Sequence, residues 1–440
     1  MGELTTDPHH LDDDRVVEAV AAWMPGTRWY PLKGTRPAVV LERTWPLGDD
    51  AAILLLRADD VLLQVPVALR DEPGEAPIAR LGDRWLVDGC ADPATVRALL
   101  AAATGTTAVP GLEGDAVETP AEGGIRVLAG EQSNTSIIGG DGRWIAKAFR
   151  VVSPGDNPEV VVTGALTRGG TRGVPRLLAS LRGSWAAGET TVTGHLLAVS
   201  SFVAGGEDAW ALFRAHALES VRGGASPAPD ARGLGAAVAT VHRELATALG
   251  TAEADDEDAL RFVAGLEQRM AWARDEAAEA LEPFAGGLAL EAERLRGATR
   301  LGTLQQIHGD LHLGQVLRDL EGRWILLDFE GEPLRPLHER MVRETPLRDV
   351  VGMLRSFDYA AGSALQEARD GDADAARDWV AARQAEFLAG YEAEAGPVDR
   401  DDPVLRALLL DKALYEVVYE VRNRPEWLPV PLEAVRAIVG

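Results

Sequence analysis

The chain has 440 residues, of which 46% are hydrophobic and 26% charged, and its formal net charge is −25 at pH 7. This length exceeds what one hydrophobic core usually supports, so we expect two or three domains. The acidic balance argues against general nucleic-acid binding, because phosphate backbones would be repelled. No run of about 18 apolar residues is present, which argues against a membrane span. Cys90 is the only cysteine and the acidic N-terminal stretch is unlike a signal peptide, so we expect no internal disulfide and a cytoplasmic location.

The N-terminal quarter of the chain predicts a small α/β unit. Its expected elements, in chain order, are a helix over 13–24, strands over 38–47, 51–58 and 61–69, and a helix over 92–103. Asp92 is the predicted N-cap of the second helix, with Pro93 at its first helical position. We therefore predict a cap domain over residues 1–106.

The remainder divides into a strand-rich part and a helical part. Residues 107–122 lack periodicity and predict a linker. Strands are expected over 125–130, 135–140, 143–150 and 195–203. From about residue 208 the apolar pattern is helical and is interrupted only near residues 300–335. The predicted organisation is a β-rich lobe over 123–206 and a helical lobe over 207–440.

Polar residues gather in the interrupted region, in QIHGDLHLGQ (306–315) and DFEGEP (328–333). Phosphoryl transfer needs a carboxylate that accepts a proton from the attacking hydroxyl and oxygen ligands for magnesium. Asp310 fits the base, Gln315 lies five positions later as an amide ligand, and Asp328 follows a predicted strand as a second ligand. His308 is expected to orient the loop through a hydrogen bond.

Two other interpretations of this cluster remain open. His308 and His312 are four positions apart, which is a zinc-binding spacing on a helix. Gly309 and the strand-like flanks disfavour a helix there, and no cysteine lies nearby. The second alternative is a set of buried polar groups that satisfy one another. The carboxylate and amide spacing favours phosphoryl transfer over both.

A nucleotide site is predicted in the β-rich lobe. Lys147 is one of only three lysines among 44 basic residues, and it lies in a predicted strand eleven positions after Ser136. That is where a kinase-like lobe places the lysine that contacts the α and β phosphates. Glu159, on the next predicted helix, is its nearest carboxylate. The hydroxyls and backbone N–H groups of a polar turn could hold phosphates, and the backbone near Ser201 to Val203 is the expected hinge for adenine.

Several motifs resemble the bacterial maltokinase-like family, which is related to aminoglycoside phosphotransferases: GEQSNTS, QIHGDLHLGQVL, LLDFEGEP, TPLRDVVGMLRSFDYAA and DKALYEVVYEVRNRPEWLPVPL. The resemblance implies an α/β, bilobal, protein-kinase-like fold with an N-terminal cap, and the use of ATP and Mg²⁺. It implies Asp310 as the catalytic base, Gln315 and Asp328 as magnesium ligands, and Glu330 near a second metal. It also implies Lys147 as the phosphate contact; the other candidate nucleotide contacts are Gln132, Ser133, Asn134, Thr135 and Ser136 of the polar turn and Ser201 and Val203 of the hinge. This chain departs from the family pattern at Val161, where an acidic residue is expected, which leaves the partner of Lys147 open.

The acceptor is expected near the C-terminal motif. On a helix, Lys412, Glu416, Tyr419, Glu420 and Asn423 fall on one stripe, with Asp411 beside it and Trp427 beyond. A solvated face with i, i+4 pairs such as Lys412–Glu416 is the alternative. Aromatic and amide residues among the charges favour a sugar site instead, and the carboxylates favour an aminosugar.

The family includes kinases for maltose and for glucosamine. We therefore predict an ATP-dependent sugar kinase that converts glucosamine to glucosamine 6-phosphate, with maltose 1-kinase and an aminoglycoside-type phosphotransferase as alternatives. A pseudokinase is disfavoured because the candidate catalytic residues are all present. The expected partners are a small sugar and ATP, without nucleic acid or membrane, and a monomer is the working expectation.

Overall fold

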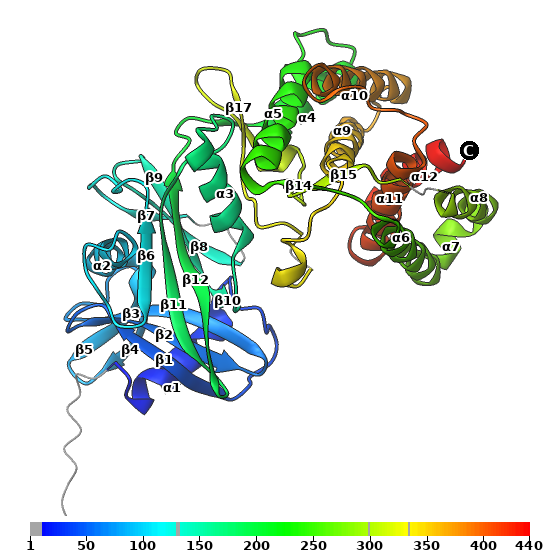
Figure 1. Cartoon of the computed structure of the whole chain (residues 1–440). Coiled ribbons are helices and arrows are strands. Elements are labelled where there is room, and N and C mark those ends of the chain that lie inside the picture. Colours follow the sequence, from blue (N-terminus) through cyan, green and yellow to red (C-terminus); the bar gives the residue numbers. More distant parts are fainter. Residues whose placement is uncertain (1–10, 129–132, 298–299, 333–334) are drawn as a thin grey trace, which may run out of the picture. The chain divides into compact units, whose positions relative to one another are not determined.

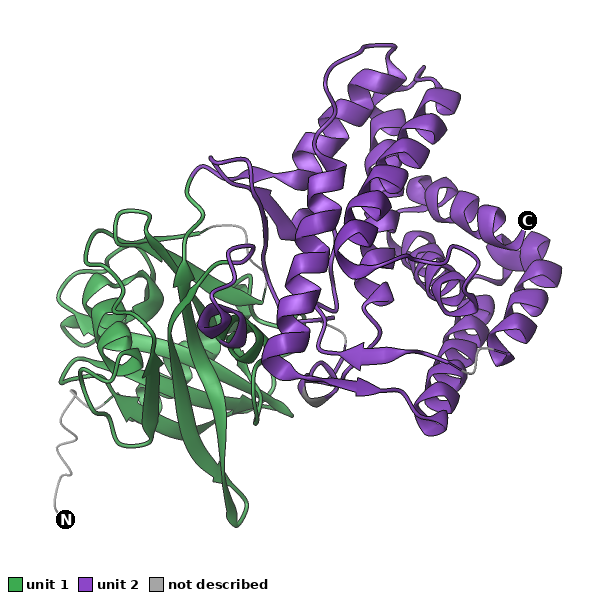
Figure 2. Cartoon of the chain, turned by 45° about the horizontal axis from the view of Figure 1, so that its top comes forward, with its two compact units in different colours: residues 1–164, 175–204 green, residues 165–174, 205–440 purple. Residues whose placement is uncertain are grey.

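The computed structural model describes residues 11–128, 133–297, 300–332 and 335–440 (Figure 1). The chain forms two compact units (Figure 2). Unit 1 comprises Met1–Gly164 and Pro175–Ala204, and unit 2 comprises Ala165–Val174 and Gly205–Gly440. Unit 1 is rich in strands and includes the predicted cap, whereas unit 2 is mainly helical, so the predicted mixed α/β class is confirmed.

The first sheet of unit 1 is antiparallel and has the strand order β1-β2-β3-β5-β4, with β10 also paired to β3. The elements of this part are α1 (Asp14–Trp23), β1 (Val39–Pro46), β2 (Ala51–Ala58), β3 (Val61–Arg70), β4 (Pro77–Leu81), β5 (Arg84–Asp88), α2 (Pro93–Ala103) and β10 (Val151–Val152). The Asp92 side chain accepts a hydrogen bond from Thr95 N, which confirms the predicted N-cap of α2.

The second sheet of unit 1 has the order β6-β11-β12-β9-β8-β7 and is also antiparallel. Its strands are β6 (Leu112–Ala116), β7 (Arg126–Val127), β8 (Asn134–Gly139), β9 (Trp144–Phe149), β11 (Leu177–Ala187) and β12 (Thr190–Ser201), and α3 (Pro158–Gly169) follows β10. Residues 107–122, for which the sequence predicts a linker, include the strand β6. Its backbone pairs with β11 at the edge of the sheet, and such pairing needs no apolar periodicity.

The two sheets share a core because β2 is buried on both faces. Its side chains alternate, as the period of two requires. Ile53 and Leu55 pack with the second sheet and α2, whereas Leu54 and Leu56 pack with residues of α1. The continuous apolar run of β2 is therefore typical of a strand covered on both sides.

Polar groups also join the cap to the second sheet. The buried Gln64 amide of β3 donates to Phe149 O at 3.2 Å and to Leu196 O at 3.0 Å. Arg150, which is fully buried, donates to Asp88 Oδ2 at 2.5 Å and to Thr135 Oγ1 at 2.7 Å. Because buried polar groups are costly when left unmatched, these bonds fix the register between cap and sheet.

Unit 2 is mainly helical and contains a three-stranded sheet, β13-β16-β17, and a two-stranded sheet, β14-β15. Its elements are β13 (Glu207–Asp208), α4 (Ala209–Val221), α5 (Ala231–Leu249), β14 (Thr251–Glu253), α6 (Asp256–Glu276), α7 (Ala278–Leu281), α8 (Ala285–Arg296), β15 (Thr303–Gln305), β16 (Val316–Arg318), β17 (Trp324–Leu326), α9 (Leu347–Ala368), α10 (Ala373–Ala395), α11 (Pro403–Asn423) and α12 (Pro429–Val439). One core lies among α6, α8, α11 and α12 (Figure 1). Within the residues that the structure describes, no helix combines the length and apolarity that a membrane crossing requires.

Candidate active site

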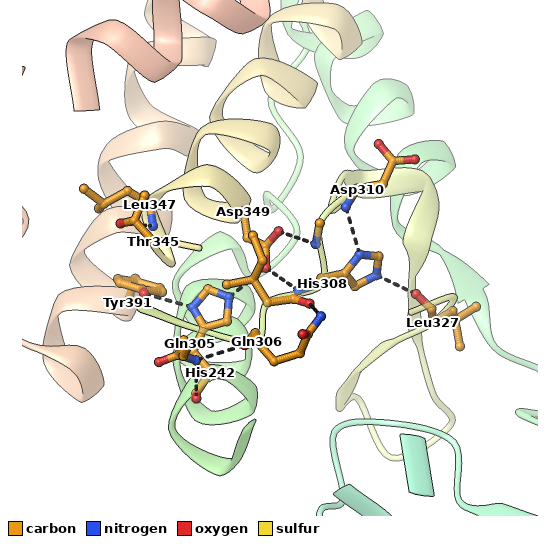
Figure 3. A network of polar contacts seen from close by, with 12 residues as sticks. His242, Gln305, Gln306, His308, Asp310, Leu327, Thr345, Leu347, Asp349 and Tyr391 are labelled. Carbon is orange, nitrogen blue, oxygen red and sulfur yellow. Dashed lines mark hydrogen bonds and ion pairs between the residues drawn. The ribbon is translucent and has the colours of Figure 1, made fainter. Parts of the chain in front are cut away.

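The buried carboxylate of Asp349, in the first turn of α9, anchors the loop that follows β15 (Figure 3). Asp349 accepts hydrogen bonds from His308 N at 2.8 Å, from Gly309 N at 2.9 Å and from His242 Nε2 at 2.9 Å. Burial raises the pKa of Asp349, but the bonds from His242 and Gly309 outweigh it and hold that pKa below its usual range. Asp349 therefore remains ionised and fixes the backbone on which Asp310 is carried.

The anchor extends to two further helices. His242 of α5 donates through Nε2 to Asp349 and accepts through Nδ1 from the hydroxyl of Tyr391 of α10, at 2.9 Å. Gln305 Nε2 donates to His242 O at 2.7 Å. The network thus joins α5, α9, α10 and β15, and these hydrogen bonds give the loop a rigid support (Figure 3). The sequence reasoning assigned no role to Asp349, His242 or Tyr391.

Two glycines permit this geometry. Gly309 has φ +84°, a conformation that favours glycine, and it turns the chain between His308 and Asp310. A Cβ at Gly352 of α9 would lie 2.2 Å from Leu311 O, so only glycine allows the loop to rest on the helix.

His308 connects the loop to the following hairpin. Its Nε2 donates to Leu327 O at 2.7 Å, its Nδ1 lies 3.4 Å from Asp310 N, and its ring packs against Phe329 with centroids 4.7 Å apart. These contacts fit the predicted orienting role. His308 lies in a loop and not on a helix. No group of three or more His, Cys, Asp or Glu residues in the described part of the chain is arranged to hold a metal, so the zinc alternative gains no support.

Gln315 and Asp328 meet at the base of the β16–β17 hairpin. Gln315 Nε2 donates to Asp328 Oδ2 at 3.2 Å. Asp328 has φ +62°, an uncommon conformation for a non-glycine residue that turns the chain as it leaves the strand. Glu330 follows, and its carbonyl accepts from Arg340 Nη1 at 3.3 Å. The structure therefore brings the Gln315 amide and the Asp328 carboxylate together, as their spacing in the sequence predicted.

Asp310 lines a pocket of about 350 Å³ within unit 2. The pocket is lined by Arg269, Gly309, Asp310, Leu311, Glu332, Arg335, Glu339, Arg348, Asp349, Val351, Gly352, Leu408, Asp411, Lys412 and Tyr415. Burial raises the pKa of Asp310 above its usual value, Lys412 opposes that shift, and Glu332 and Asp328 add to it. A base with a raised pKa accepts a proton more readily, which suits the attack of a hydroxyl.

Helix α11 contributes two of the predicted substrate residues to this pocket. Asp411 and Lys412 line it, together with Tyr415 of the same helix. Asp411 is mostly buried and is paired with Arg269 at 2.6 Å, with Arg348 at 3.9 Å. The Lys412 ammonium lies 5.7 Å from the centre of the Tyr415 ring.

The other predicted substrate residues lie outside this lining, and most are occupied by neighbours. The Glu416 carboxylate accepts from Arg355 Nη2 at 2.6 Å, and Glu420 accepts from the Tyr359 hydroxyl at 3.0 Å. Both carboxylates are buried inside unit 2. The alternative of a solvated face is therefore wrong for these two residues.

The end of α11 forms an aromatic corner. Tyr419 is exposed, and Asn423 Nδ2 donates to Tyr419 O at 2.9 Å. Trp427 stacks on Tyr359 with ring centroids 6.2 Å apart, and Arg424 lies 5.0 Å from the Trp427 ring. Trp427 therefore belongs to a packed corner next to the buried ion pairs.

Unit 1 carries the predicted nucleotide residues. Lys147 Nζ lies 3.6 Å from Glu159 Oε1, so the structure gives Lys147 a carboxylate partner despite the apolar Val161. Ser136 stands opposite Lys147 in the β8–β9 ladder, and its hydroxyl is buried with no hydrogen-bond partner among the residues described. Gln132 lies outside the described residues.

The remaining predicted nucleotide residues differ in exposure. Ser133 is exposed and Asn134 begins β8. The Thr135 hydroxyl is turned to the interior, where it accepts from Arg150. Ser201 ends β12, where its hydroxyl accepts from Arg176 N at 2.9 Å, and Val203 is partly exposed. In the expected hinge, Ser201 N donates to Arg176 O at 2.8 Å and Phe202 N donates to Arg143 O at 3.0 Å.

Comparison with known proteins gives matches over nearly the whole chain. Residues 125–408 match the family model of the phosphotransferase enzyme family, and residues 23–92 match that of the maltokinase N-terminal cap domain. A glucosamine kinase of Streptacidiphilus jiangxiensis is 30% identical over 418 residues, 89% of each chain, and one of Mycolicibacterium smegmatis is 29% identical over 72% of this chain and 80% of its own. A solved glucosamine kinase in complex with glucosamine, ADP and inorganic phosphate is similar with a TM-score of 0.74 and 26% identity, covering 96% of this chain and 99% of the other.

Proposed function

Because the chain belongs to the phosphotransferase enzyme family, we propose that it transfers the γ-phosphoryl group of ATP to glucosamine and produces glucosamine 6-phosphate. The observation that carries this proposal is the likeness to glucosamine kinases across both units, including a structure that holds glucosamine and ADP. The pocket at Asp310 supports it, because a cavity of about 350 Å³ with this many charged side chains suits a small polar acceptor.

In this proposal Asp310 accepts the proton of the sugar hydroxyl as that oxygen attacks the γ-phosphorus. Asp349 holds the loop backbone, and His308 fixes the loop against the next hairpin. Positioning of this kind contributes much of the catalysis of phosphoryl transfer, since the protein does little covalent chemistry. Lys147, paired with Glu159, is the proposed contact for the nucleotide phosphates.

Magnesium is the proposed metal, and the residues present fit it. The Gln315 amide and the Asp328 carboxylate both carry hard oxygen donors, and the Gln315 Nε2 group donates to Asp328 Oδ2 at 3.2 Å, so rotation of the amide would turn its oxygen toward a shared ion. One or two protein ligands of this kind are typical of Mg²⁺ sites completed by nucleotide phosphates and water. The bound ion would neutralise charge on the phosphates, and Glu330 would act on its water shell.

The counter-charge for the glucosamine ammonium is proposed to be Glu332. Asp411 is held by two arginines, whereas Glu332 makes one ion pair among the residues that the structure describes, with Arg335 at 2.9 Å, and its side chain is 37% exposed. Glu332 also raises the pKa of Asp310 after the larger effect of burial, so the two carboxylates oppose each other's charge. An ammonium group beside Glu332 would relieve that opposition and leave Asp310 ionised.

The test is an ATP-consumption assay against glucosamine, glucose, maltose and kanamycin, with the product phosphate located by NMR. Glucosamine with phosphate on the 6-hydroxyl is the expected result. A higher kcat/KM for maltose would replace this proposal with maltose 1-kinase, which the match to the maltokinase cap domain keeps as the second candidate. Among the described residues that line the pocket, Tyr415 is the only aromatic one, which favours a monosaccharide over a longer sugar.

Two matched substitutions test the amine contact. Glu332→Gln is expected to lower kcat/KM for glucosamine about 10- to 150-fold more than for glucose, as loss of a charge-assisted hydrogen bond implies. Asp411→Asn, which acts through Arg269 and Arg348, is expected to lower kcat/KM for glucosamine and for glucose by the same factor. An equal decrease in kcat/KM for glucosamine and glucose in Glu332→Gln would show that Glu332 binds only sugar hydroxyls.

A further inference from the structure

The ion pair between Lys147 and Glu159 depends on where α3 begins. Lys147 is fixed in β9, in the middle of a six-stranded sheet. Glu159 is the second residue of α3, so its carboxylate moves whenever the start of that helix moves. Both side chains are mostly buried, and the atoms that join them are 3.6 Å apart. A small shift of the helix start would therefore change the pair.

Asn157 sets that start. Its Oδ1 accepts from Glu159 N at 2.9 Å, and its carbonyl accepts from Val160 N and Val161 N at 3.1 Å each. The bonds from Glu159 N and Val160 N satisfy two of the N–H groups that a helix leaves free at its N-terminus, and the bond from Val161 N is the first i→i−4 bond of the helix. The backbone N–H of Asn157 donates in turn to His195 Nδ1 at 3.0 Å.

His195 is a buried residue of β12 that is built into the second sheet. Arg182 of β11 lies 3.2 Å from His195 Nε2 and is itself held by Asp156 at 2.5 Å. Gly155 N donates to Thr193 O at 2.8 Å, so the segment before α3 is tied to β12 at two points. Burial, and then the charge of Arg182, lower the pKa of His195 to about 4, which keeps the ring neutral and its Nδ1 able to accept.

We propose that His195 is a positioning residue for nucleotide binding: through Asn157 it sets the start of α3, and with it the pair between Lys147 and Glu159. The inference rests on the proposed function, because the pair matters only if Lys147 contacts nucleotide phosphates. His195 itself touches neither ligand in this proposal. It acts by transferring the fixed position of β12 to the first turn of α3.

The experiment compares His195→Leu with His195→Asn. Leucine removes the acceptor, whereas an asparagine Oδ1 can take the place of Nδ1 and accept from Asn157 N. His195→Leu is expected to raise KM for ATP, and Kd for ATP measured by calorimetry without sugar, about five- to tenfold, with KM for glucosamine within about twofold of the parent. His195→Asn is expected to restore both constants to within about twofold.

Gln64→Leu is the matched control. It removes two buried hydrogen bonds, one of them to Leu196 O next to His195, without touching α3. It is expected to lower the thermal unfolding midpoint without changing KM for ATP. A rise in KM for ATP equal to that in His195→Leu would overturn the inference, because it would reduce the effect to general loosening of β12.

The inference also fails if His195→Leu keeps the parent Kd for ATP, or if His195→Asn is no better than His195→Leu. Failure of the proposed function looks different. A parent enzyme that binds ATP but phosphorylates none of the sugars would refute the acceptor assignment, while the ATP affinities of the His195 variants would still decide the role of His195.

Discussion

Asp349→Asn is the substitution that tests the catalytic loop most directly. One carboxylate oxygen, Oδ1, accepts from Gly309 N, and the other accepts from both His308 N and His242 Nε2. An asparagine must turn its NH₂ group toward one of these positions. The less costly orientation points the NH₂ group at Gly309 N. The hydrogen bond from Gly309 N is then lost, whereas those from His308 N and His242 Nε2 to the other oxygen remain.

The magnitude follows from those contacts. A hydrogen bond to a charged group contributes about 1.5–3 kcal/mol, and leaving the buried N–H of Gly309 unmatched costs about 1–3 kcal/mol. We therefore expect a loss of about 3–5 kcal/mol in the free energy of unfolding of the unit that contains α9. A shift of the Asp310 backbone by about 1 Å would lower kcat about 100-fold. KM for both substrates should change little, because the binding groups stay in place.

The assay combines steady-state kinetics with thermal unfolding and a nucleotide-binding measurement that gives the folded fraction. Asp319→Asn is the control, since the Asp319 carboxylate also accepts from two backbone N–H groups, at 2.9 Å and 2.8 Å, but in the turn between β16 and β17. It should leave kcat unchanged. A folded Asp349→Asn enzyme with kcat within twofold of the parent would refute the idea that this carboxylate positions the base.

Further predictions concern the pocket and the ion pairs behind it. Asp310→Asn should lower kcat by several orders of magnitude with little change in ATP affinity, and near-parental turnover would contradict its role as base. Lys412→Met should move the acid limb of the pH profile of kcat/KM to higher pH, because Lys412 opposes the increase that burial causes in the pKa of Asp310; an unmoved limb would exclude this coupling. Gln315→Ala and Asp328→Ala should raise the magnesium concentration needed for half-maximal rate, Asp328→Ala more strongly, and titrations like the parent's would refute the metal site. Burial raises the pKa of Asp358 from 3.8 to about 6, so protonation of Asp358 increases the free energy of unfolding as pH falls from about 6 toward 3.8, by up to about 3 kcal/mol. Asp358→Asn should lose this part of the pH dependence of the free energy of unfolding. An unchanged pH dependence would contradict the shift.

The sequence predicted elements best where local signals were strong. The apolar spacing of residues 13–24 and the Asp92–Pro93 start corresponded to α1 and α2. The strands β4, β5 and β11 were not predicted. β4 and β5 are five residues long and interrupted by charges, and β11 contains Gly183 within a mixed run. β4 pairs with β5 and β11 with β12 across short turns (Leu81↔Arg84 and Ala187↔Thr190), so what was missing was a clear apolar alternation within each strand, and their strand state comes from pairing and packing in the sheet.

The same distinction holds in the site. Gln315 and Asp328 lie on one loop and the hairpin that follows, and their spacing was enough to predict that they lie close together. Asp349 lies on another helix, and two of its three partners are backbone N–H groups, which every residue type has except proline. A buried anchor of this kind leaves no pattern of side chains that a sequence reader could pair with it. Only its presence in the first turn of an apolar helix hints at a buried acid.

The helical stripe of α11 shows why charge pairing is harder to predict than helical phase. The stripe placed Lys412, Glu416 and Glu420 on one side of the helix, and the structure has all three on α11. Which of them meets a ligand depends on cations from other elements, however: Arg355 of α9 takes Glu416, and Arg424, just after α11, takes Glu420. A buried carboxylate that already has a guanidinium partner gains little from a second cation, because the cost of its burial is already offset. Glu332 is also paired with a guanidinium, that of Arg335, but its side chain is 37% exposed and not buried, so the aminosugar ammonium is expected there, outside α11 and its stripe.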